Sequence, residues 1–192
     1  MTPEPLEQFR RWFADAETAG IRAPHAMALA TAGRDGAPSV RMVLLKGADE
    51  DGFVFFTGYG SRKGAELEAN PRAALLFYWD PLGRQVRVEG PVERVDGAES
   101  DAYFATRPRA AQLAAAASRQ GRVLASREEL DVRVTELERE HADGDVPRPE
   151  HWGGYRLRPE SYEFWQHREN RLHDRLRYRR DVGRWLLERL AP

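Results

Sequence analysis

One stretch of the chain, residues 41–63, constrains the fold more than any other. Its sequence is RMVLLKGADEDGFVFFTGYGSRK, in which a lysine closes the apolar run 43–45 and residues 53–57 form a β-branched and aromatic run. Residues 49–52 (DEDG), between the two runs, have the composition of a tight turn. The pattern therefore predicts two short strands joined by a turn. Residues 58–60 (GYG) then form a short loop that leads into a helix.

The end of this stretch has the composition of an anion-binding site. Ser61, Arg62 and Lys63 stand at the start of the expected helix, where free backbone N–H groups, a hydroxyl and two cations converge. Cations also stand at both ends of the first strand, at Arg41 and Lys46. We expect a phosphate here. The spacing alone leaves a plainer interpretation open, because strand-end arginines are commonly solvated and serine is a common N-cap.

Lysine is rare in this sequence. Of the 30 Lys and Arg residues only Lys46 and Lys63 are lysines, which leaves 30 − 2 = 28 arginines. Such a bias is typical of genome composition. Both remaining lysines nevertheless lie in the stretch described above, where a compact point charge is not always replaceable by a planar guanidinium.

Short apolar runs separated by turns continue on both sides of this stretch. Residues 26–31 and 73–79 are apolar, residues 33–36 (GRDG) form a hairpin turn, and residues 84–95 alternate valines with polar side chains. Gly90-Pro91 is expected to bend the last of these strands. The sequence thus predicts an antiparallel meander, and a sheet this small avoids open edges most readily by curling into a barrel. We expect a mainly β fold with flanking helices.

Helices precede and follow the strands in the sequence. A packing helix is expected over residues 1–20, and alanine-rich or charged segments predict a helical insertion over residues 96–142. Further strands are expected over residues 150–192. The last of these, residues 185–190, is expected to close the barrel.

The totals exclude several classes of protein. With 192 residues, one compact domain over residues 1–192 is expected, and a net charge of -1 argues against nucleic acid or another bulk polyanion as a partner. Cysteine is absent, which excludes disulfides, a thiol nucleophile and thiolate metal ligands. The N-terminus has no apolar secretory segment and no apolar run reaches the length of a membrane span, so we expect a cytoplasmic protein without membrane contact.

A second polar cluster lies near the C-terminus, in residues 165–175 (WQHRENRLHDR). If a strand begins at Arg171, then Arg171, His173 and Arg175 share one face by the period of two. Two guanidiniums beside an imidazole suit an anionic ligand better than an apolar core, which would leave their donors unpaired. A solvated face on an edge strand is the alternative interpretation.

A third cationic group consists of Tyr103, Arg107 and Arg109. Tyr103 and Arg107 are four residues apart, so on a helix they would share a face and could close on one phosphate. The alternative is that arginine is favoured at this position by the dipole of a helix C-terminus.

Other chemistries find little support. The five histidines show no H-x-x-x-H spacing and no carboxylate cluster accompanies them, so no metal site is expected. A nucleophile elbow and a G-x-G-x-x-G dinucleotide motif are also missing from the sequence.

Taken together, the motifs resemble those of the pyridoxamine 5′-phosphate oxidase family. The likeness runs from about residue 26 to residue 192, and although each motif is weak alone, eight of them in order at matching spacings are specific. The segments that carry it are residues 41–46, 60–63, 84–86, 103–109, 118–120, 152–154, 163–166 and 170–175.

The resemblance implies a single split-barrel domain over residues 1–192 that forms a homodimer, with FMN bound in clefts at the subunit interface. It implies oxidation of pyridoxamine or pyridoxine 5′-phosphate to pyridoxal 5′-phosphate, with O2 as acceptor and hydrogen peroxide as by-product. In such an enzyme the cofactor supplies the hydride chemistry, while the protein supplies orientation and charge.

Roles for individual residues follow from the same motif match. Arg62 and Lys63, with Ser61, would hold the FMN phosphate, and the rest of the flavin would be lined by Arg41, Phe56, Thr57, Gln85, Gln120, Trp165 and Arg175. The substrate phosphate would be held by Lys46, Tyr103 and Arg107. Arg171 and His173 would cover the pyridine ring as the catalytic pair, acting by orientation and proton handling.

The chain departs from the family pattern at three places. Ala111 stands where the family usually has a serine that binds the substrate phosphate, and Gly121 stands where it usually has a serine at the flavin phosphate. His167-Arg168 replaces a small pair that contains glycine. These departures leave two alternatives open: a related FMN oxidase of another planar aromatic, as in phenazine biosynthesis, or a non-catalytic protein that binds flavin or pyridoxal phosphate.

Overall fold

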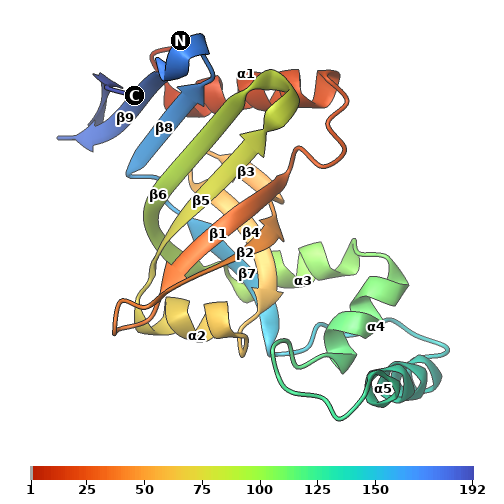
Figure 1. Cartoon of the computed structure of the whole chain (residues 1–192). Coiled ribbons are helices and arrows are strands. Elements are labelled where there is room, and N and C mark those ends of the chain that lie inside the picture. Colours follow the sequence, from red (N-terminus) through yellow and green to blue (C-terminus); the bar gives the residue numbers. More distant parts are fainter. Residues whose placement is uncertain (1) are drawn as a thin grey trace.

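The structure, a computed structural model, describes residues 2–192, and antiparallel strands dominate it. Figure 1 shows the strands as one strongly curled sheet with helices at its ends and along one side. The strands are β1 (Ala26–Ala32), β2 (Pro38–Leu44), β3 (Gly47–Asp49), β4 (Gly52–Gly58), β5 (Arg72–Trp79), β6 (Arg84–Arg94), β7 (Trp152–Leu157), β8 (Ser161–Gln166), β9 (Asp174–Asp181) and β10 (Arg184–Leu190).

Five α-helices and two short 3-10 turns complete the described chain. The expected helix over residues 1–20 is observed as α1, while residue 1 lies outside the described part. Asp96 and Ser126 cap α3 and α5, with their side chains accepting bonds from the N–H groups of Glu99 and Glu129. The helices are α1 (Pro5–Thr18), α2 (Arg62–Ala69), α3 (Gly97–Ala105), α4 (Arg109–Ala117) and α5 (Arg127–Glu140), and the 3-10 turns are η1 (Asp80–Leu82) and η2 (Glu169–Arg171).

The long strand β6 joins two parts of the sheet. Its residues 84–89 pair with β8, while its residues 92–94 pair with β7. The change of partner occurs at Gly90, where a Cβ atom would lie 1.9 Å from the carbonyl oxygen of Arg158. The main path of the sheet is β10-β9-β8-β6-β5-β1-β2, and β7, β4 and β3 branch from β6. This arrangement confirms the predicted antiparallel split barrel.

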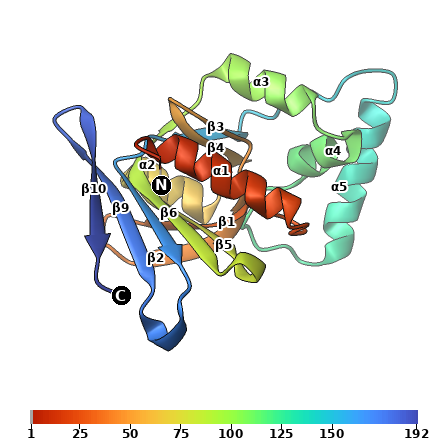
Figure 2. The same cartoon turned by 90° about the horizontal axis from the view of Figure 1, so that it is seen from above.

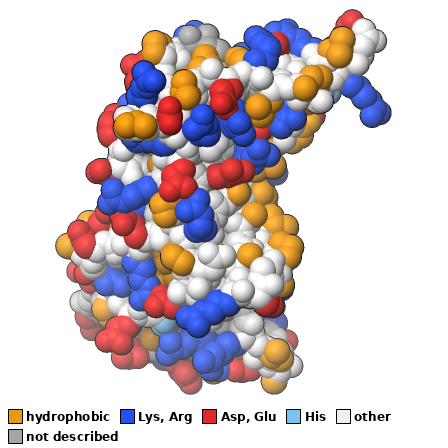
Figure 3. Space-filling model, turned by 90° about the vertical axis from the view of Figure 1, so that its left-hand side faces the viewer, with side chains coloured by type: hydrophobic (Ala, Val, Ile, Leu, Met, Phe, Trp, Pro, Cys, Tyr) orange, Lys and Arg blue, Asp and Glu red, His pale blue; other side chains and the backbone are white. Residues whose placement is uncertain are grey.

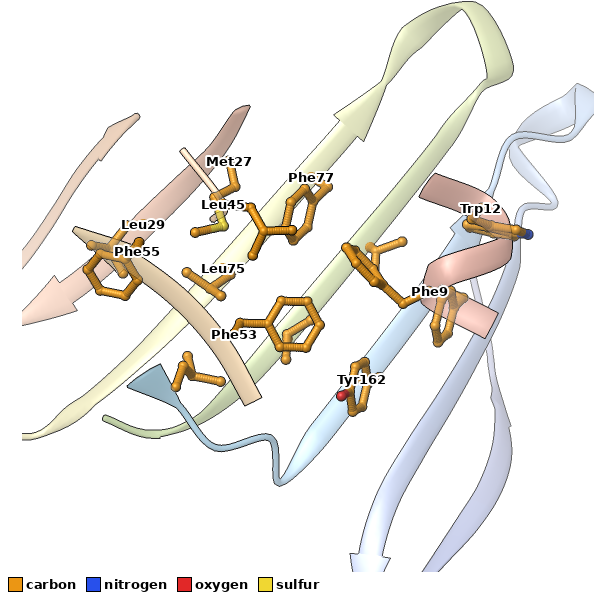
Figure 4. Close-up of a cluster of buried hydrophobic side chains, with 14 of the residues drawn as sticks. Phe9, Trp12, Met27, Leu29, Leu45, Phe53, Phe55, Leu75, Phe77 and Tyr162 are labelled. Atoms are coloured by element: carbon orange, nitrogen blue, oxygen red, sulfur yellow. The ribbon is translucent and has the colours of Figure 1, made fainter. Parts of the chain in front are cut away.

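Inward-facing side chains of the curled sheet form one large core. Alternate residues of the strands are buried, as in β1, where Met27 and Leu29 are completely buried. Helix α1 closes one end of the barrel with Phe9 and Trp12, and Figure 4 shows these side chains pointing toward the strands. The ring of Phe9 lies 4.9 Å from that of Phe53. Burial of each such side chain contributes roughly 1.5–3 kcal/mol to stability.

The turn predicted at residues 49–52 is confirmed, but the prediction that it joins the apolar run 43–45 to the return strand is wrong. Strand β2 pairs with β1 along its whole length, whereas β4 pairs with the three-residue strand β3. The chain changes sheets at Leu45 and Lys46, because Leu45 turns its side chain into the core and its N–H group bonds the carbonyl of His25. The N–H group of Lys46 instead bonds the carbonyl of Val54, on β4.

The prediction that residues 185–190 close the barrel is also wrong. Within the described chain β10 pairs with β9 alone and forms one end of the sheet, while β2 forms the other end. Figure 2 shows β9 and β10 on the side of the molecule opposite α4 and α5. The two ends of the sheet therefore do not pair with each other within one protomer, and the barrel stays open.

The surface is charged but of mixed sign. On the face shown in Figure 3, Lys and Arg side chains are interspersed with Asp and Glu side chains, in agreement with the net charge of -1. Among the described residues, no helix combines the length and the apolar character that a membrane-crossing segment would need.

The turn between β9 and β10 carries backbone strain that a substitution should relieve. Val182 and Gly183 connect the paired residues Asp181 and Arg184, and both have positive φ, 44° and 81°. Asparagine tolerates this conformation far better than a β-branched residue. Because Val182 is 98% exposed, no packing is lost on its replacement. We expect Val182→Asn to raise the free energy of unfolding by about 1 kcal/mol in urea denaturation.

The matched control is Gly183→Ala in the same turn. A Cβ atom at Gly183 meets open space, so the φ angle alone decides the effect. We expect Gly183→Ala to lower the free energy of unfolding by about 1 kcal/mol. A Val182→Asn protein that is less stable than the parent would show that the turn is not of this type.

Candidate functional site

The corner between β4 and α2 holds the helix start at which the sequence predicts an anion site. Strand β4 ends at Gly58, and Ser61 then caps α2 by accepting a bond from the N–H group of Gly64 at 3.3 Å. Gly64 is required there, since a Cβ atom would lie 2.0 Å from the carbonyl oxygen of Tyr59. The tight approach lets the first turn of α2 start beside the strand end, and the predicted N-cap is thus confirmed.

Lys63 carries a buried positive charge in this corner. The residue is only 7% exposed, and its ammonium group donates to the side-chain oxygens of Thr57 at 3.0 Å, Ser61 at 3.1 Å and Gln120 at 2.9 Å. These acceptors are neutral. Burial, together with the positive charge of Arg41, lowers the pKa of Lys63 to about 8. A buried ammonium bonded to neutral oxygens favours an anion nearby.

Glu66 organises the two arginines of the corner. Its carboxylate accepts bonds from Arg62 Nε at 2.8 Å and from Arg41 Nη2 at 3.2 Å, and the hydroxyls of Thr31 and Ser39 donate to it at 2.5 Å each. Burial alone would raise the pKa of Glu66, but the bonds from Ser39, Thr31, Arg62 and Arg41 outweigh it and lower the pKa to about 2. The carboxylate is therefore ionised at neutral pH.

A cavity of about 980 Å³ opens beside this corner. It brings the predicted flavin-phosphate group together with the predicted substrate-phosphate group, of which Tyr103 and Arg107 lie far from it in the sequence. The residues from our predictions that line it are Arg41, Lys46, Phe56, Thr57, Ser61, Arg62, Lys63, Tyr103, Arg107 and Gln120. Ala111 and Gly121, two of the departures from the family pattern, line it as well.

The third cationic group reaches the cavity from the end of α3, which carries Tyr103, and from the segment between α3 and α4, which carries Arg107. The prediction that Tyr103 and Arg107 share a helix face is wrong, because α3 ends at Ala105 and Arg107 follows it. Arg107 lies over the ring of Trp152 at 4.7 Å, and its buried Nη1 has no hydrogen-bond partner among residues 2–192. Burial lowers the pKa of Arg107. An unpaired buried guanidinium nitrogen is what a phosphate oxygen would satisfy.

Arg109 does not belong to this group. Its guanidinium donates to the backbone carbonyls of Gly144, at 2.8 Å, and His141. It therefore ties α4 to the end of α5. Lys46, by contrast, does approach the group, since its ammonium lies 5.8 Å from the centre of the Tyr103 ring.

Aromatic rings form one wall of the cavity. The rings of Phe56 and Tyr103 stack at 4.0 Å with an angle of 17° between them, and the ring of Trp152 lies nearly parallel to both, 5.5 Å from Phe56 and 6.2 Å from Tyr103. Gly153 and Gly154 let strand β7 approach, because a Cβ atom at Gly154 would lie 2.8 Å from the Phe56 ring. The stack holds the Tyr103 ring in the cavity wall.

The remaining predicted flavin residues lie in a separate pocket. Gln85, Trp165 and Arg175 line a cavity of about 240 Å³ on the outer face of β6, β8 and β9. Arg175 donates to the buried Glu163 at 2.8 Å, which raises the pKa of the arginine. Arg87 donates to the other oxygen of Glu163 at 2.5 Å. These residues belong to the half of the molecule that carries β8 to β10.

Arg171 and His173 also belong to this half, but not in the predicted way. A strand does not begin at Arg171, because η2 occupies Glu169–Arg171 and β9 begins at Asp174. Arg171 is exposed and has a φ of 62°. The ring of His173 lies 4.6 Å from that of Trp165 and 5.2 Å from that of His167, and its Nδ1 accepts a bond from the N–H group of Arg168.

Our sequence reasoning missed two buried carboxylates. Glu66 follows Arg62 by four residues on one helix, a spacing that signals an ion pair. Glu163 gave no local signal, since its partners Arg87 and Arg175 come from two neighbouring strands. Their positions depend on the register of the sheet, which the sequence pattern does not specify to the residue.

The curled sheet and the cation-lined cavity define a split-barrel protein with a candidate anion site. The chain belongs to the pyridoxamine 5′-phosphate oxidase family. The family's sequence model matches residues 13–140, and the model of the family's C-terminal dimerisation region matches residues 152–192. The second match indicates a homodimer.

Relatives of known name agree with this assignment. A pyridoxine/pyridoxamine 5′-phosphate oxidase of Rubrobacter xylanophilus is 62% identical over 99% of this chain and 88% of its own length. One of Salinibacter ruber is 57% identical over 100% of this chain and 91% of its own length. Among solved structures, PhzG from Burkholderia lata, in complex with tetrahydrophenazine-1-carboxylic acid, is 37% identical with a TM-score of 0.95, and the match covers 100% of this chain and 94% of PhzG.

The lowered pKa of the buried Lys63 predicts that binding of FMN is sensitive to alkaline pH. Because its pKa is lowered to about 8, the ammonium charge is lost as the pH rises through this value. A phosphate monoester is already a dianion above neutrality, so the ligand charge does not change in this range. We expect the affinity for FMN, measured by quenching of flavin fluorescence, to fall about tenfold between about pH 7 and pH 9.5.

Lys63→Gln provides the control for this pH effect. The amide is neutral throughout, so the variant should bind FMN more weakly at pH 7 and show little further loss up to about pH 9.5. An affinity of the parent protein that stays constant over this range would contradict the role given to the Lys63 charge.

Proposed function

We propose that the protein is an FMN-dependent oxidase that converts pyridoxamine 5′-phosphate or pyridoxine 5′-phosphate to pyridoxal 5′-phosphate. O2 is the acceptor and hydrogen peroxide the by-product. One observation carries the proposal: two incompletely compensated cations, the Lys63 ammonium and the Arg107 guanidinium, face one cavity from different elements. A cofactor and a substrate that each bear a phosphate account for both.

The residues of the corner fit the phosphate end of FMN. Ser61, Arg62 and Lys63 offer a helix start, a largely exposed guanidinium and a buried ammonium. Thr57 and Gln120 support Lys63 by accepting its bonds. When bound, the flavin would accept a hydride from the substrate, and the residues of this chain would supply orientation and charge.

The other group suits the phosphate of the substrate. Lys46, Tyr103 and Arg107 offer an ammonium, a phenol and a guanidinium at the same rim of the cavity. Because Ala111 contributes no hydroxyl, one hydrogen bond of about 0.5–1.5 kcal/mol is missing relative to a serine. The aromatic wall behind Tyr103 holds the phenol in place.

We propose further that each site is completed across the dimer. Arg171, His173, Gln85, Trp165 and Arg175 lie outside the larger cavity of their own protomer and on the side that carries β8 to β10. The outer face of β2 exposes Val40 and Met42 beside that cavity, at 69% and 63% exposure, as an apolar surface for a partner. The partner's Arg171 and His173 would then cover the substrate ring and handle its proton.

The structural neighbour PhzG supports a second candidate, an FMN oxidase of a planar aromatic acid. A carboxylate needs fewer donors than a phosphate. This chain retains three donor side chains for the substrate anion, Lys46, Tyr103 and Arg107. The first candidate therefore fits the cavity better.

Turnover in air tests the proposal directly. Purified protein with FMN and pyridoxamine 5′-phosphate should form pyridoxal 5′-phosphate, seen by its absorbance, and peroxide in equal amount. Bound FMN without product would favour the aromatic-acid oxidase or a non-catalytic binding protein. Failure to bind FMN would overturn the proposed function altogether.

Mixed dimers test whether the site is shared between protomers. We expect Arg171→Ala and Arg107→Ala each to reduce turnover by about 100-fold or more as homodimers. In a heterodimer of the two variants, isolated by two different affinity tags, one of the two sites would be intact, so activity should return to about half of the parent value.

The Arg171→Ala homodimer should still bind FMN, which controls for loss of the cofactor. A heterodimer that is no more active than its two parents would show that Arg107 and Arg171 of the same protomer act together. That result would contradict the shared site without contradicting the oxidase activity.

A further inference from the structure

Glu66 stands behind the phosphate corner and holds a negative charge close to it. The residue is 9% exposed and connects three elements, because Thr31 lies on β1, Ser39 and Arg41 lie on β2, and Arg62 shares helix α2 with Glu66. A carboxylate at this place repels an incoming phosphate. We therefore expect Glu66 to make a second contribution, one that favours phosphate binding and offsets this repulsion.

The two arginines bonded to Glu66 differ in the donors that they keep free. Arg41 is largely saturated, since Nη1 donates to the Leu29 carbonyl at 3.1 Å and to Thr31 at 2.5 Å, and Nη2 donates to Ser39 and Glu66. Arg62 uses its Nε for Glu66. Among residues 2–192 no partner bonds the forked end of its guanidinium, and its side chain is 69% exposed on the cavity wall.

We propose that Glu66 is a positioning residue for the cofactor phosphate, which fixes Arg62 through Nε so that the two Nη groups of this arginine face the phosphate. Arg41, Thr31 and Ser39 complete the coordination of the carboxylate. Arg41 therefore holds Glu66 in place, whereas Arg62 contacts the phosphate of the cofactor. The inference rests on the proposed binding of FMN at this corner.

The geometry favours a carboxylate over an amide at this position. Four donors converge on the two oxygens of Glu66, and both oxygens are used. An amide offers one oxygen, and its NH2 group would face a donor, either Arg62 Nε or the hydroxyls. Glu66→Gln therefore removes the tie to Arg62 or the tie to β1 and β2 without changing the size of the side chain.

A double-mutant cycle on FMN affinity tests the inference. Dissociation constants are measured by quenching of flavin fluorescence for the parent, Glu66→Gln, Arg62→Ala and the double variant. We expect each single variant to weaken binding about tenfold. The double variant should bind no more weakly than Arg62→Ala alone, because Glu66 acts through that arginine.

A purely structural role of Glu66 gives a different result. In that case the two effects multiply, so the double variant would bind about 100-fold more weakly than the parent, and the inference would be overturned. Parent-like binding by Glu66→Gln would overturn it too. If the parent itself binds no FMN, the proposed function fails, and this inference fails with it.

Two further variants serve in this test, one as a control and one as a substitute for Glu66→Gln. Glu68→Gln lies on the same helix, but Glu68 is exposed and pairs with Arg94 at 3.0 Å outside the cavity, so its FMN affinity should equal that of the parent. Glu66→Asp keeps the charge near Thr31 and Ser39 but shortens the reach to Arg62. If Glu66→Gln does not fold, Glu66→Asp takes its place in the cycle with the same expected pattern.

Discussion

An ammonium group buried among neutral oxygens is the interaction on which this site depends. Lys63 uses its donors on Thr57, Ser61 and Gln120, which hold the group in place without cancelling its charge. Three residues further along α2, Glu66 provides the opposite arrangement, a buried carboxylate with its charge compensated by arginines. One short helix thus carries a positive charge whose bonded partners are all neutral and, one turn on, a negative charge that two arginines compensate.

The site also depends on how the sheet is divided. The larger cavity collects cations from β2, α2 and the segment after α3, while the aromatic and basic residues of β8 and β9 lie elsewhere. The family's dimerisation region covers residues 152–192 and includes β8, β9 and β10. Two of the strands that line the second pocket, β8 and β9, are therefore also strands of the dimerisation region.

Local sequence patterns predicted much of this molecule. The turn-separated apolar runs indicated the antiparallel split barrel, and the composition of residues 61–63 indicated the capped helix start. The partners of β2 and β10 were missed, because pairing in a sheet depends on contacts far apart in the chain. The left-handed backbone at Arg171 was missed for a related reason, since a non-glycine residue in that conformation leaves no compositional signal.

The shared strand β6 has a mechanical consequence. Because its first half pairs with β8 and its second half with β7, the two parts of the sheet cannot separate without breaking one continuous strand. The cavity is bounded by this stiff sheet on one side and by α3 and the following segment on the other. The helical wall is thus the part of the cavity boundary that this continuous strand does not tie into the sheet.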